Sequence, residues 1–248
     1  MSHMFILKEM MSESNRVIII GGTSGIGLVT AQYLKNKGYV PIVAGRRSVD
    51  LEGIETCKVD VCSEESVAGL FNVSLKQYDD INALVYAAGI AAPQKKVENF
   101  DKDLWDNIIA TNVTGALLTL KYSFNVLKRN RGRVAIVNSL AARRCSELSG
   151  MEYTASKAAL GALVRQLSIE WASDNVLINS VYPGMTMTPM LTENVSKSKL
   201  KEIEEKIPLG RIARPEEIAR AIEFLINPEN TYITGTGVDV CGGQYLNG

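Results

Sequence analysis

Short apolar runs alternate along the chain with longer stretches in which apolar residues recur at helical spacing. The run 16–20 is rich in β-branched residues and ends at a glycine, as expected of a strand that is buried on both faces. Six further runs predict strands, at 39–45, 56–61, 81–88, 133–138, 176–182 and 237–241. Helices are predicted at 24–37, 101–127, 151–172 and 215–226, and Ser63 with the two glutamates after it predicts the start of another.

Strands that alternate with helices form βαβ units, whose right-handed crossovers build a parallel sheet with helices on both faces. We therefore expect a single α/β domain over residues 16–248, with a doubly wound and mostly parallel sheet. Residues 1–15 form an N-terminal extension, and its opening Met-Ser-His-Met is typical of a remnant of an expression vector. The segment 185–206 is irregular, and its Lys/Glu-rich part 197–206 predicts a solvated helix, a mobile substrate lid, or both.

The composition narrows the classes of function. Lys and Arg total 27, as do Asp and Glu, so there is no basic excess for a nucleic-acid backbone. The single histidine, His3, lies in the extension, which argues against a Ser-His-Asp triad and a His-bearing zinc site, and no metal is expected. Four cysteines without a CxxC pair, no secretory signal and no long apolar run favour free thiols in a cytoplasmic protein outside the membrane.

A glycine-rich turn lies between the first predicted strand and the first predicted helix. Its spacing is Gly-x-x-x-Gly-x-Gly from Gly21 to Gly27. Glycine lets the backbone approach a pyrophosphate, and a helix N-terminus offers free N–H groups to the anion. A plain tight turn is the alternative, but the position after the first strand favours a dinucleotide site. The turn is not a P-loop, because no Gly-Lys-Ser/Thr follows.

The end of the second predicted strand favours NADP(H) over NAD(H). An NAD site usually has a carboxylate there for the ribose 2′-hydroxyl, whereas this chain has Gly45-Arg46-Arg47. Two guanidinium groups suit a 2′-phosphate. Two solvated surface arginines are the alternative, and use of NAD(H) stays open.

Tyr153 and Lys157 lie four residues apart on the predicted helix 151–172, so a phenol and an ammonium group share one face. A phenol with a pKa of ~10 is a poor base at neutral pH unless a nearby cation stabilises the phenolate. Taken alone this spacing is common, and an exposed Tyr–Lys pair is the simpler interpretation.

Together these residues resemble the short-chain dehydrogenase/reductase family, in its compact single-domain branch, from about residue 16 to residue 248. The motifs occur in the family's order: the Gly21–Gly27 turn, Ala87-Ala88-Gly89, Asn112, Ser139, Tyr153 with Lys157, Pro183-Gly184, and Gly242-Gly243. Within the family the chain is similar to 3-oxoacyl-acyl-carrier-protein reductases. The resemblance implies a Rossmann-like fold and an NADP(H)-dependent oxidoreductase that interconverts a ketone and a secondary alcohol by hydride transfer.

The resemblance also implies the role of each site residue. Tyr153 would be the general acid/base, Ser139 would polarise the reacting oxygen, and Lys157 would lower the pKa of Tyr153 and hold the nicotinamide ribose. Asn112 would anchor a water that links Lys157 to a proton relay. The implied cofactor-binding residues are Gly21, Thr23, Ser24, Gly25, Ile26, Gly27, Arg46, Arg47, Asp60, Val61, Ala88, Gly89, Tyr153, Lys157, Pro183, Gly184, Thr186 and Thr188. A homotetramer, or a dimer, is expected through the helices 101–127 and 151–172.

The chain departs from the family's pattern at two positions. Ile20 replaces the usual threonine and Tyr86 the usual asparagine, and both changes are expected to weaken local hydrogen bonding. Ser139 and Tyr153 are 14 residues apart, one more than expected, and the extra residue falls in the loop that should line the substrate pocket.

The substrate stays open between several classes. Reduction of a 3-oxoacyl group on an acyl carrier protein needs a basic patch, and Lys128, Arg129, Arg131 and Arg133 offer half of one. A small polar ketone, a sugar or a secondary metabolite is the broader expectation. Arg143 and Arg144 contact an anionic substrate or are solvated loop charges. A protein that senses NADP(H) without catalysis is the alternative from another functional class.

Overall fold

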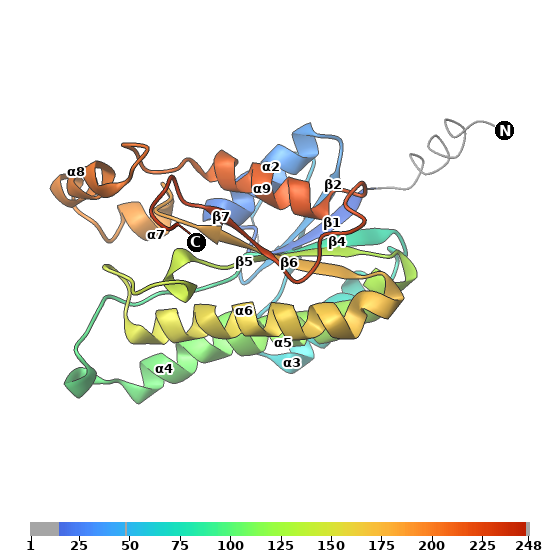
Figure 1. The fold of residues 1–248 in the computed structure, drawn as a ribbon. Helices are drawn as coiled ribbons and strands as arrows, with labels where there is room; N and C mark the ends of the chain where they lie inside the picture. The colour runs from blue at the N-terminus through green and yellow to red at the C-terminus, as the bar shows by residue number, and fades with distance from the viewer. Residues whose placement is uncertain (1–14, 48, 247–248) are drawn as a thin grey trace.

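The computed structural model describes residues 15–47 and 49–246, so the expected N-terminal extension, apart from Asn15, lies outside the described residues. The strands form one parallel sheet in the order β3-β2-β1-β4-β5-β6-β7 (Figure 1). They are β1 (Arg16–Ile20), β2 (Val40–Gly45), β3 (Glu55–Lys58), β4 (Ile81–Tyr86), β5 (Arg133–Val137), β6 (Leu177–Pro183) and β7 (Gly237–Val240). The strand order reverses between β1 and β4, which is where open α/β sheets bind ligands.

Helices cover both faces of this sheet, with α2 and α9 on one face and α3, α5 and α6 on the other (Figure 1). The helices are α2 (Gly25–Asn36), α3 (Glu64–Gly69), α4 (Lys102–Ile109), α5 (Gly115–Arg129), α6 (Met151–Trp171), α7 (Pro189–Thr192), α8 (Lys197–Lys206) and α9 (Pro215–Ile226). Strand β1 shows why two layers form. Val17 and Ile19 pack in the α2/α9 layer, and Ile18 and Ile20 in the other, because successive side chains of a strand point to opposite faces. The doubly wound α/β fold is therefore confirmed.

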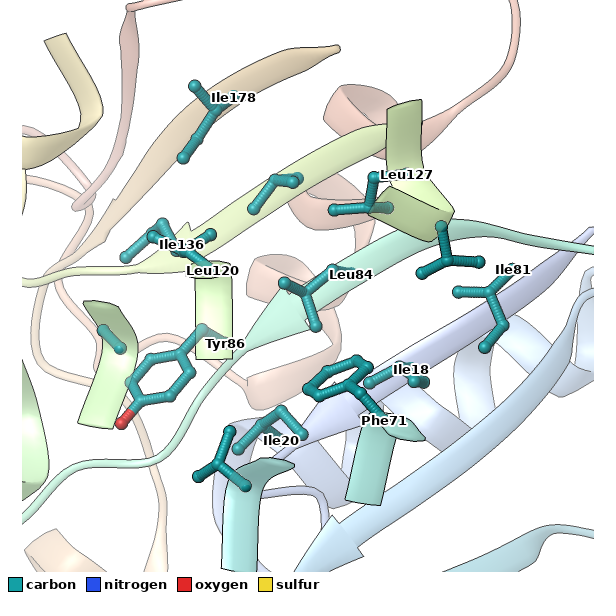
Figure 2. Close-up of a cluster of buried hydrophobic side chains, with 14 of the residues drawn as sticks. Ile18, Ile20, Phe71, Ile81, Leu84, Tyr86, Leu120, Leu127, Ile136 and Ile178 are labelled. Atoms are coloured by element: carbon teal, nitrogen blue, oxygen red, sulfur yellow. The ribbon is translucent and has the colours of Figure 1, made fainter. Parts of the chain in front are cut away.

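The larger of the two cores lies between the sheet and the α3/α5/α6 layer. Strand residues such as Ile18, Leu84 and Ile136 meet Leu120 and Leu127 of α5 there (Figure 2). All five side chains are almost completely buried, so each contributes about 1.5–3 kcal/mol of transfer free energy. This packing fixes the ends of β4 and β5, from which the loops of the site described below emerge.

The predicted helix 101–127 is not one continuous α-helix. A π-helical turn, η3 (Ala110–Thr114), separates α4 from α5. The Tyr86 hydroxyl donates a hydrogen bond to the Thr111 carbonyl at 2.7 Å, which ties this turn to the sheet. Such a tertiary bond leaves no trace in the hydrophobic period, so the sequence could not predict the turn. The expectation that Tyr86 weakens local hydrogen bonding is therefore wrong, whereas Ile20 is an apolar, fully buried core residue.

The strand predicted at 56–61 stops early, because β3 is an edge strand that pairs only with β2. The last residue of β2, Gly45, lies opposite Lys58. Val59 donates its N–H to the Gly45 carbonyl at 2.9 Å, and beyond that point β3 has no partner to pair with. Residues 59–61 therefore leave the sheet and become available to line a site.

The segment 185–206 contains α7 and α8. Ser196 caps α8 by accepting from the Lys199 N–H at 3.3 Å, so the predicted helix 197–206 is confirmed. Ile203 of α8 and Leu191 of α7 form a small cluster with Ile207 and Ile212 that is separate from both cores. Whether the segment acts as a lid stays a prediction. None of the helices in residues 15–47 and 49–246 has the length and apolar surface that a bilayer crossing requires.

Candidate active site

A cavity of about 470 Å³ opens at the carboxyl ends of the parallel strands. Residues that follow β1, β2, β4, β5 and β6 line it, together with one face of the α6 N-terminus. The expected site residues in its lining are Gly21, Thr23, Ser24, Gly25, Ile26, Gly27, Arg46, Arg47, Val61, Ala88, Gly89, Ser139, Tyr153, Lys157, Pro183, Gly184, Thr186 and Thr188. The fold thus brings together residues that are up to 167 positions apart, from Gly21 to Thr188.

The glycine-rich turn leaves no room for side chains. Gly21 has a φ of 81°, and a Cβ there would lie 2.4 Å from the backbone nitrogen of Ala88. A Cβ on Gly27 would lie 2.4 Å from the Gly21 carbonyl oxygen. Helix α2 begins at Gly25, within this glycine-rich segment, without an acidic residue in its first turn, and the Ser24 side chain does not cap it. The unpaired N–H groups of the first turn therefore form a site suited to an anion.

Arg46 and Arg47 line the cavity where it meets the end of β2, and both are exposed. Gly45 packs closely against Thr23, because a Cβ at position 45 would lie 2.8 Å from the Thr23 Cγ2 atom. Val61 lines this end of the cavity, but Asp60 does not. The Asp60 carboxylate instead accepts from the Cys62 N–H at 3.0 Å, which holds the turn after β3.

Ser139, Tyr153 and Lys157 meet inside the cavity. Ser139 lies two residues after the end of β5, and the other two lie one turn apart on α6. Ser139 and Tyr153 both line the cavity, and Ser139 acts on the Tyr153 phenol as a hydrogen-bond donor that lowers its pKa. The Lys157 Nζ atom donates to the Val137 carbonyl at 2.9 Å and lies 5.6 Å from the centre of the Tyr153 ring. The exposed Tyr–Lys pair considered from spacing alone is therefore wrong, since Lys157 is 4% exposed.

Burial dominates the electrostatics of this group. It raises the pKa of Tyr153, opposed by the hydrogen bond from Ser139. It lowers the pKa of Lys157 to about 8. The resemblance implies that Lys157 lowers the pKa of Tyr153. In the protein without bound cofactor, burial has the larger effect, and the pKa of Tyr153 is raised. At neutral pH Tyr153 carries its proton, which suits it to donate one.

Asn112 lies in the π-helical turn behind Lys157 and outside the cavity lining. Its side-chain oxygen accepts from the Ile90 N–H at 2.9 Å. Its side-chain nitrogen donates to the Ile90 carbonyl at 3.0 Å and to the Ser156 hydroxyl at 2.9 Å. The side chain thus binds the loop after β4 to helix α6.

The loop after β6 closes the cavity on its other side. A Cβ on Gly184 would lie 2.3 Å from the side-chain oxygen of Gln244, and that oxygen accepts from the Met185 N–H at 2.9 Å. Thr186 and Thr188 follow in the lining. Gln244 was not among the site residues expected from the sequence. The one feature of the sequence that points to it is its position directly after Gly242-Gly243.

Asn138 is a second residue that the sequence analysis missed, although it directly precedes Ser139. Its side-chain oxygen accepts from the Ser139 N–H at 3.0 Å. Its side-chain nitrogen is buried, and no partner for it exists within the described residues. Asn138 also lines the cavity. Its side-chain oxygen holds the Ser139 backbone in place, and its side-chain nitrogen has no partner within the described residues.

The basic residues near the end of α5 do not form a free patch beside the cavity. Lys128 pairs with Asp174 at 2.8 Å, and Arg129 with Asp79 at 3.6 Å. Arg133 donates to the Asn230 carbonyl at 2.9 Å. These residues lie where β5 begins, whereas the cavity lies where the strands end.

Comparison with known proteins assigns the family. A family model described as enoyl-(acyl carrier protein) reductase, from the short-chain dehydrogenase/reductase group, matches residues 21–244. The chain belongs to the short-chain dehydrogenase/reductase family. It is therefore an NAD(P)-dependent oxidoreductase of ketones and alcohols.

Individual relatives of this short-chain dehydrogenase/reductase cover nearly its whole length. The chain is 31% identical over 244 residues to the oxidoreductase YgfF of Escherichia coli strain K12, covering 92% of this chain and 98% of that protein. It is 30% identical over 244 residues to the 3-oxoacyl-[acyl-carrier-protein] reductase FabG of Aquifex aeolicus, covering 92% and 96%. A structure of an actinorhodin polyketide ketoreductase variant with NADPH has a TM-score of 0.86 at 26% identity, covering 93% of this chain and 97% of that one.

Proposed function

We propose that this short-chain dehydrogenase/reductase uses NADP(H) to interconvert a small-molecule ketone and a secondary alcohol, with Tyr153 as general acid/base. One observation carries the proposal: Ser139 and Tyr153, with Lys157 beside the Tyr153 ring, line the same cavity as the glycine turn and Arg46. The relative named a 3-oxoacyl reductase and the structural neighbour named a ketoreductase with NADPH support the same reaction class and cofactor.

The residues present fit a bound NADP(H) molecule. The α2 N-terminus and the side-chain-free cradle at Gly21 suit the pyrophosphate, and Arg46 with Arg47 suits the 2′-phosphate. A Cβ on Gly89 would lie 3.5 Å from the Lys157 Nζ atom, so a glycine there keeps the cofactor's path to Lys157 open. When bound, NADP(H) supplies or accepts the hydride.

The chain's own residues handle the oxygen and its proton. In ketone reduction, the Ser139 hydroxyl donates a hydrogen bond to the substrate carbonyl oxygen. The Tyr153 phenol gives its proton to that oxygen as negative charge develops there, which leaves a phenolate beside the Lys157 cation. In alcohol oxidation, the phenolate takes the hydroxyl proton. The raised pKa of Tyr153 keeps the donor form at neutral pH, and the Lys157 charge stabilises the phenolate.

The segment after β6 supplies a cover for this site. Met190, Leu191, Asn194 and Val195 line the cavity from α7 and the turn after it. This segment packs on its own small cluster rather than on the main core, so it can move without disturbing the sheet. We therefore propose that the segment 185–206 acts as a substrate lid.

The test is oxidation of NADPH by the purified protein with a panel of ketones that includes acetoacetyl thioesters, sugar-like ketones and aryl ketones. Turnover is expected, and Tyr153→Phe should lower kcat by about 10²–10⁴-fold while calorimetric titration shows NADPH binding little changed. Near-normal turnover in Tyr153→Phe would contradict the role of Tyr153. Binding of NADPH without any turnover across the panel would instead favour the non-catalytic sensor.

A further inference from the structure

Two neighbouring arginines in the loop after β5 have different surroundings. Arg143 is partly buried, and its Nε atom lies 3.3 Å from the Asp239 carboxylate of β7. Its guanidinium group lies 3.9 Å from the centre of the Tyr182 ring. Arg143 does not line the cavity, so it fixes the loop against β6 and β7.

Arg144 lines the cavity instead. Its backbone N–H bonds to the Leu140 carbonyl at 3.1 Å, which places it one turn beyond Ser139. The Arg144 side chain is exposed, and within the described residues it forms no ion pair and no hydrogen bond. A guanidinium group with no partner on a cavity wall is available to a ligand.

The other charges near this wall are neutralised. Glu147 also lines the cavity, and its carboxylate pairs with Lys206 of α8 at 3.2 Å. Leu148, Leu191 and Val195, which belong to one apolar cluster, add apolar surface to the lining beside Ser146, Ser149 and Asn194. Arg144 is therefore the cation that a molecule meets here, beside a surface that suits an apolar body.

Arg144 and the arginines after β2 follow strands that are not neighbours in the sheet. Arg144 follows β5, and three strand positions separate β5 from β2 in the sheet. At ~4.8 Å per strand this is about 14 Å. The phosphate expected at Arg46 therefore leaves Arg144 free for the substrate.

We propose that the substrate is an oxo acid, or the matching hydroxy acid, whose carboxylate is bound by Arg144 while its ketone lies at Ser139 and Tyr153. This rests on the proposed function, and names the substrate class for the same site. A planar carboxylate matches the guanidinium fork, and one such cation suits a monoanion. The apolar surface beside Arg144 receives the carbon skeleton between the two groups.

The test compares 4-acetylbenzoate with its uncharged amide, 4-acetylbenzamide, which has the same size and the same ketone. The ratio of kcat/KM for the acid over the amide is measured for the wild type, Arg144→Gln and Arg220→Gln. Arg220 is an exposed arginine on α9 outside the cavity, so its variant controls for the loss of one surface charge. The ratio is expected to exceed one in the wild type, to fall about tenfold to a hundredfold in Arg144→Gln, and to stay unchanged in Arg220→Gln.

Each outcome separates this inference from the proposed function. Reduction of both ketones without a preference for the acid, or with a preference that survives Arg144→Gln, overturns the inference and leaves the reductase standing. If neither ketone is reduced, calorimetric titration of 4-acetylbenzoate decides the inference without turnover. Binding that weakens at least tenfold in Arg144→Gln and not in Arg220→Gln supports it, and equal binding or no binding overturns it.

Discussion

The Tyr86 hydroxyl, at the end of β4, donates to the Thr111 carbonyl of the π-helical turn at 2.7 Å. The Tyr86 ring itself lies in the main core (Figure 2). Tyr86 is fully buried, and burial raises the pKa of its hydroxyl far above the ordinary value, so it remains a donor. The next residue after Thr111 is Asn112, which holds the Ile90 loop and helix α6. One buried bond thus connects the sheet to the turn that braces Lys157.

Tyr86→Phe should therefore destabilise the protein. The substitution leaves the Thr111 carbonyl buried without this donor, and an unsatisfied buried group costs ~1–3 kcal/mol of unfolding free energy. Chemical denaturation measures the change. Tyr122→Phe is the matched control, because the Tyr122 hydroxyl donates to Glu64 at the surface, at 2.9 Å, and its loss should cost less than ~1 kcal/mol. Equal losses of unfolding free energy in Tyr86→Phe and Tyr122→Phe would show that the buried Tyr86 bond stabilises the protein no more than a surface bond does.

The bond also shows what the sequence can and cannot predict. The β-branched runs and the glycine turn are local signals, so the doubly wound α/β fold and the position of the site could be predicted from them. The π-helical turn, by contrast, is tied to the sheet by the Tyr86–Thr111 contact, which joins residues 25 positions apart. Similarly, Arg143 and Arg144 are identical in sequence terms. Only the placement of Asp239 and Tyr182 shows which of the two packs against β6 and β7.

Lys157 should make the stability of the protein depend on pH in the alkaline range. Burial lowers its pKa to about 8, against ~10.4 in an unfolded chain. Between these values the unfolded chain binds more protons, so stability rises with pH, by at most ~1.4 kcal/mol per pH unit. Below pH 8 the folded protein carries the full cost of a buried cation. The unfolding free energy of the wild type relative to Lys157→Met should therefore increase from pH 7.5 to pH 10.

Urea denaturation at a series of pH values checks this dependence. Lys121 provides a control of opposite sign, because the hydrogen bond and charge of Glu64 raise its pKa. The Lys121–Glu64 interaction stabilises the folded protein fully at pH values below the pKa of Lys121 in the unfolded chain, and this stabilisation is lost as pH rises through the raised folded pKa. The unfolding free energy of the wild type should therefore fall relative to that of Lys121→Met at high pH. If the unfolding free energy of the wild type relative to Lys157→Met stays constant or falls as pH rises, burial does not destabilise the charged form of Lys157.

The resemblance to the family predicts assembly through the helices 101–127 and 151–172, and the chain exposes apolar side chains on α5 and α6 within these ranges. Ile169 on α6 is 78% exposed and Leu117 on α5 is 44% exposed. A symmetric interface would bury such residues against their own copies. Light scattering should therefore detect a dimer or tetramer at micromolar concentration, and Ile169→Asp should yield a smaller species. A wild-type monomer at that concentration would rule out the assembly.

Arg46 should set the preference between the two nicotinamide cofactors. The 2′-phosphate is the group that distinguishes NADPH from NADH, and Arg46 lies at the end of β2 where an NAD site usually has its acid. A charge-assisted hydrogen bond is worth ~1.5–3 kcal/mol, which converts to roughly ten- to hundredfold. Because Arg46 is exposed, salt should bring the effect toward the lower figure. Arg46→Ala should thus lower the NADPH/NADH ratio of kcat/KM by about tenfold.

The position before Arg46 limits how the preference can be reversed. Gly45→Asp together with Arg46→Ala would add repulsion of the phosphate, but a Cβ at position 45 would lie 2.8 Å from the Thr23 Cγ2 atom. Thr23 must therefore move, and we expect Gly45→Asp to be fully effective only when combined with Thr23→Ser, which lacks that methyl group. Arg47→Ala, measured at the same ionic strength, serves as the comparison for Arg46→Ala. A wild-type ratio below one would overturn the assignment of NADP(H) and leave the fold and the Tyr153 chemistry in place.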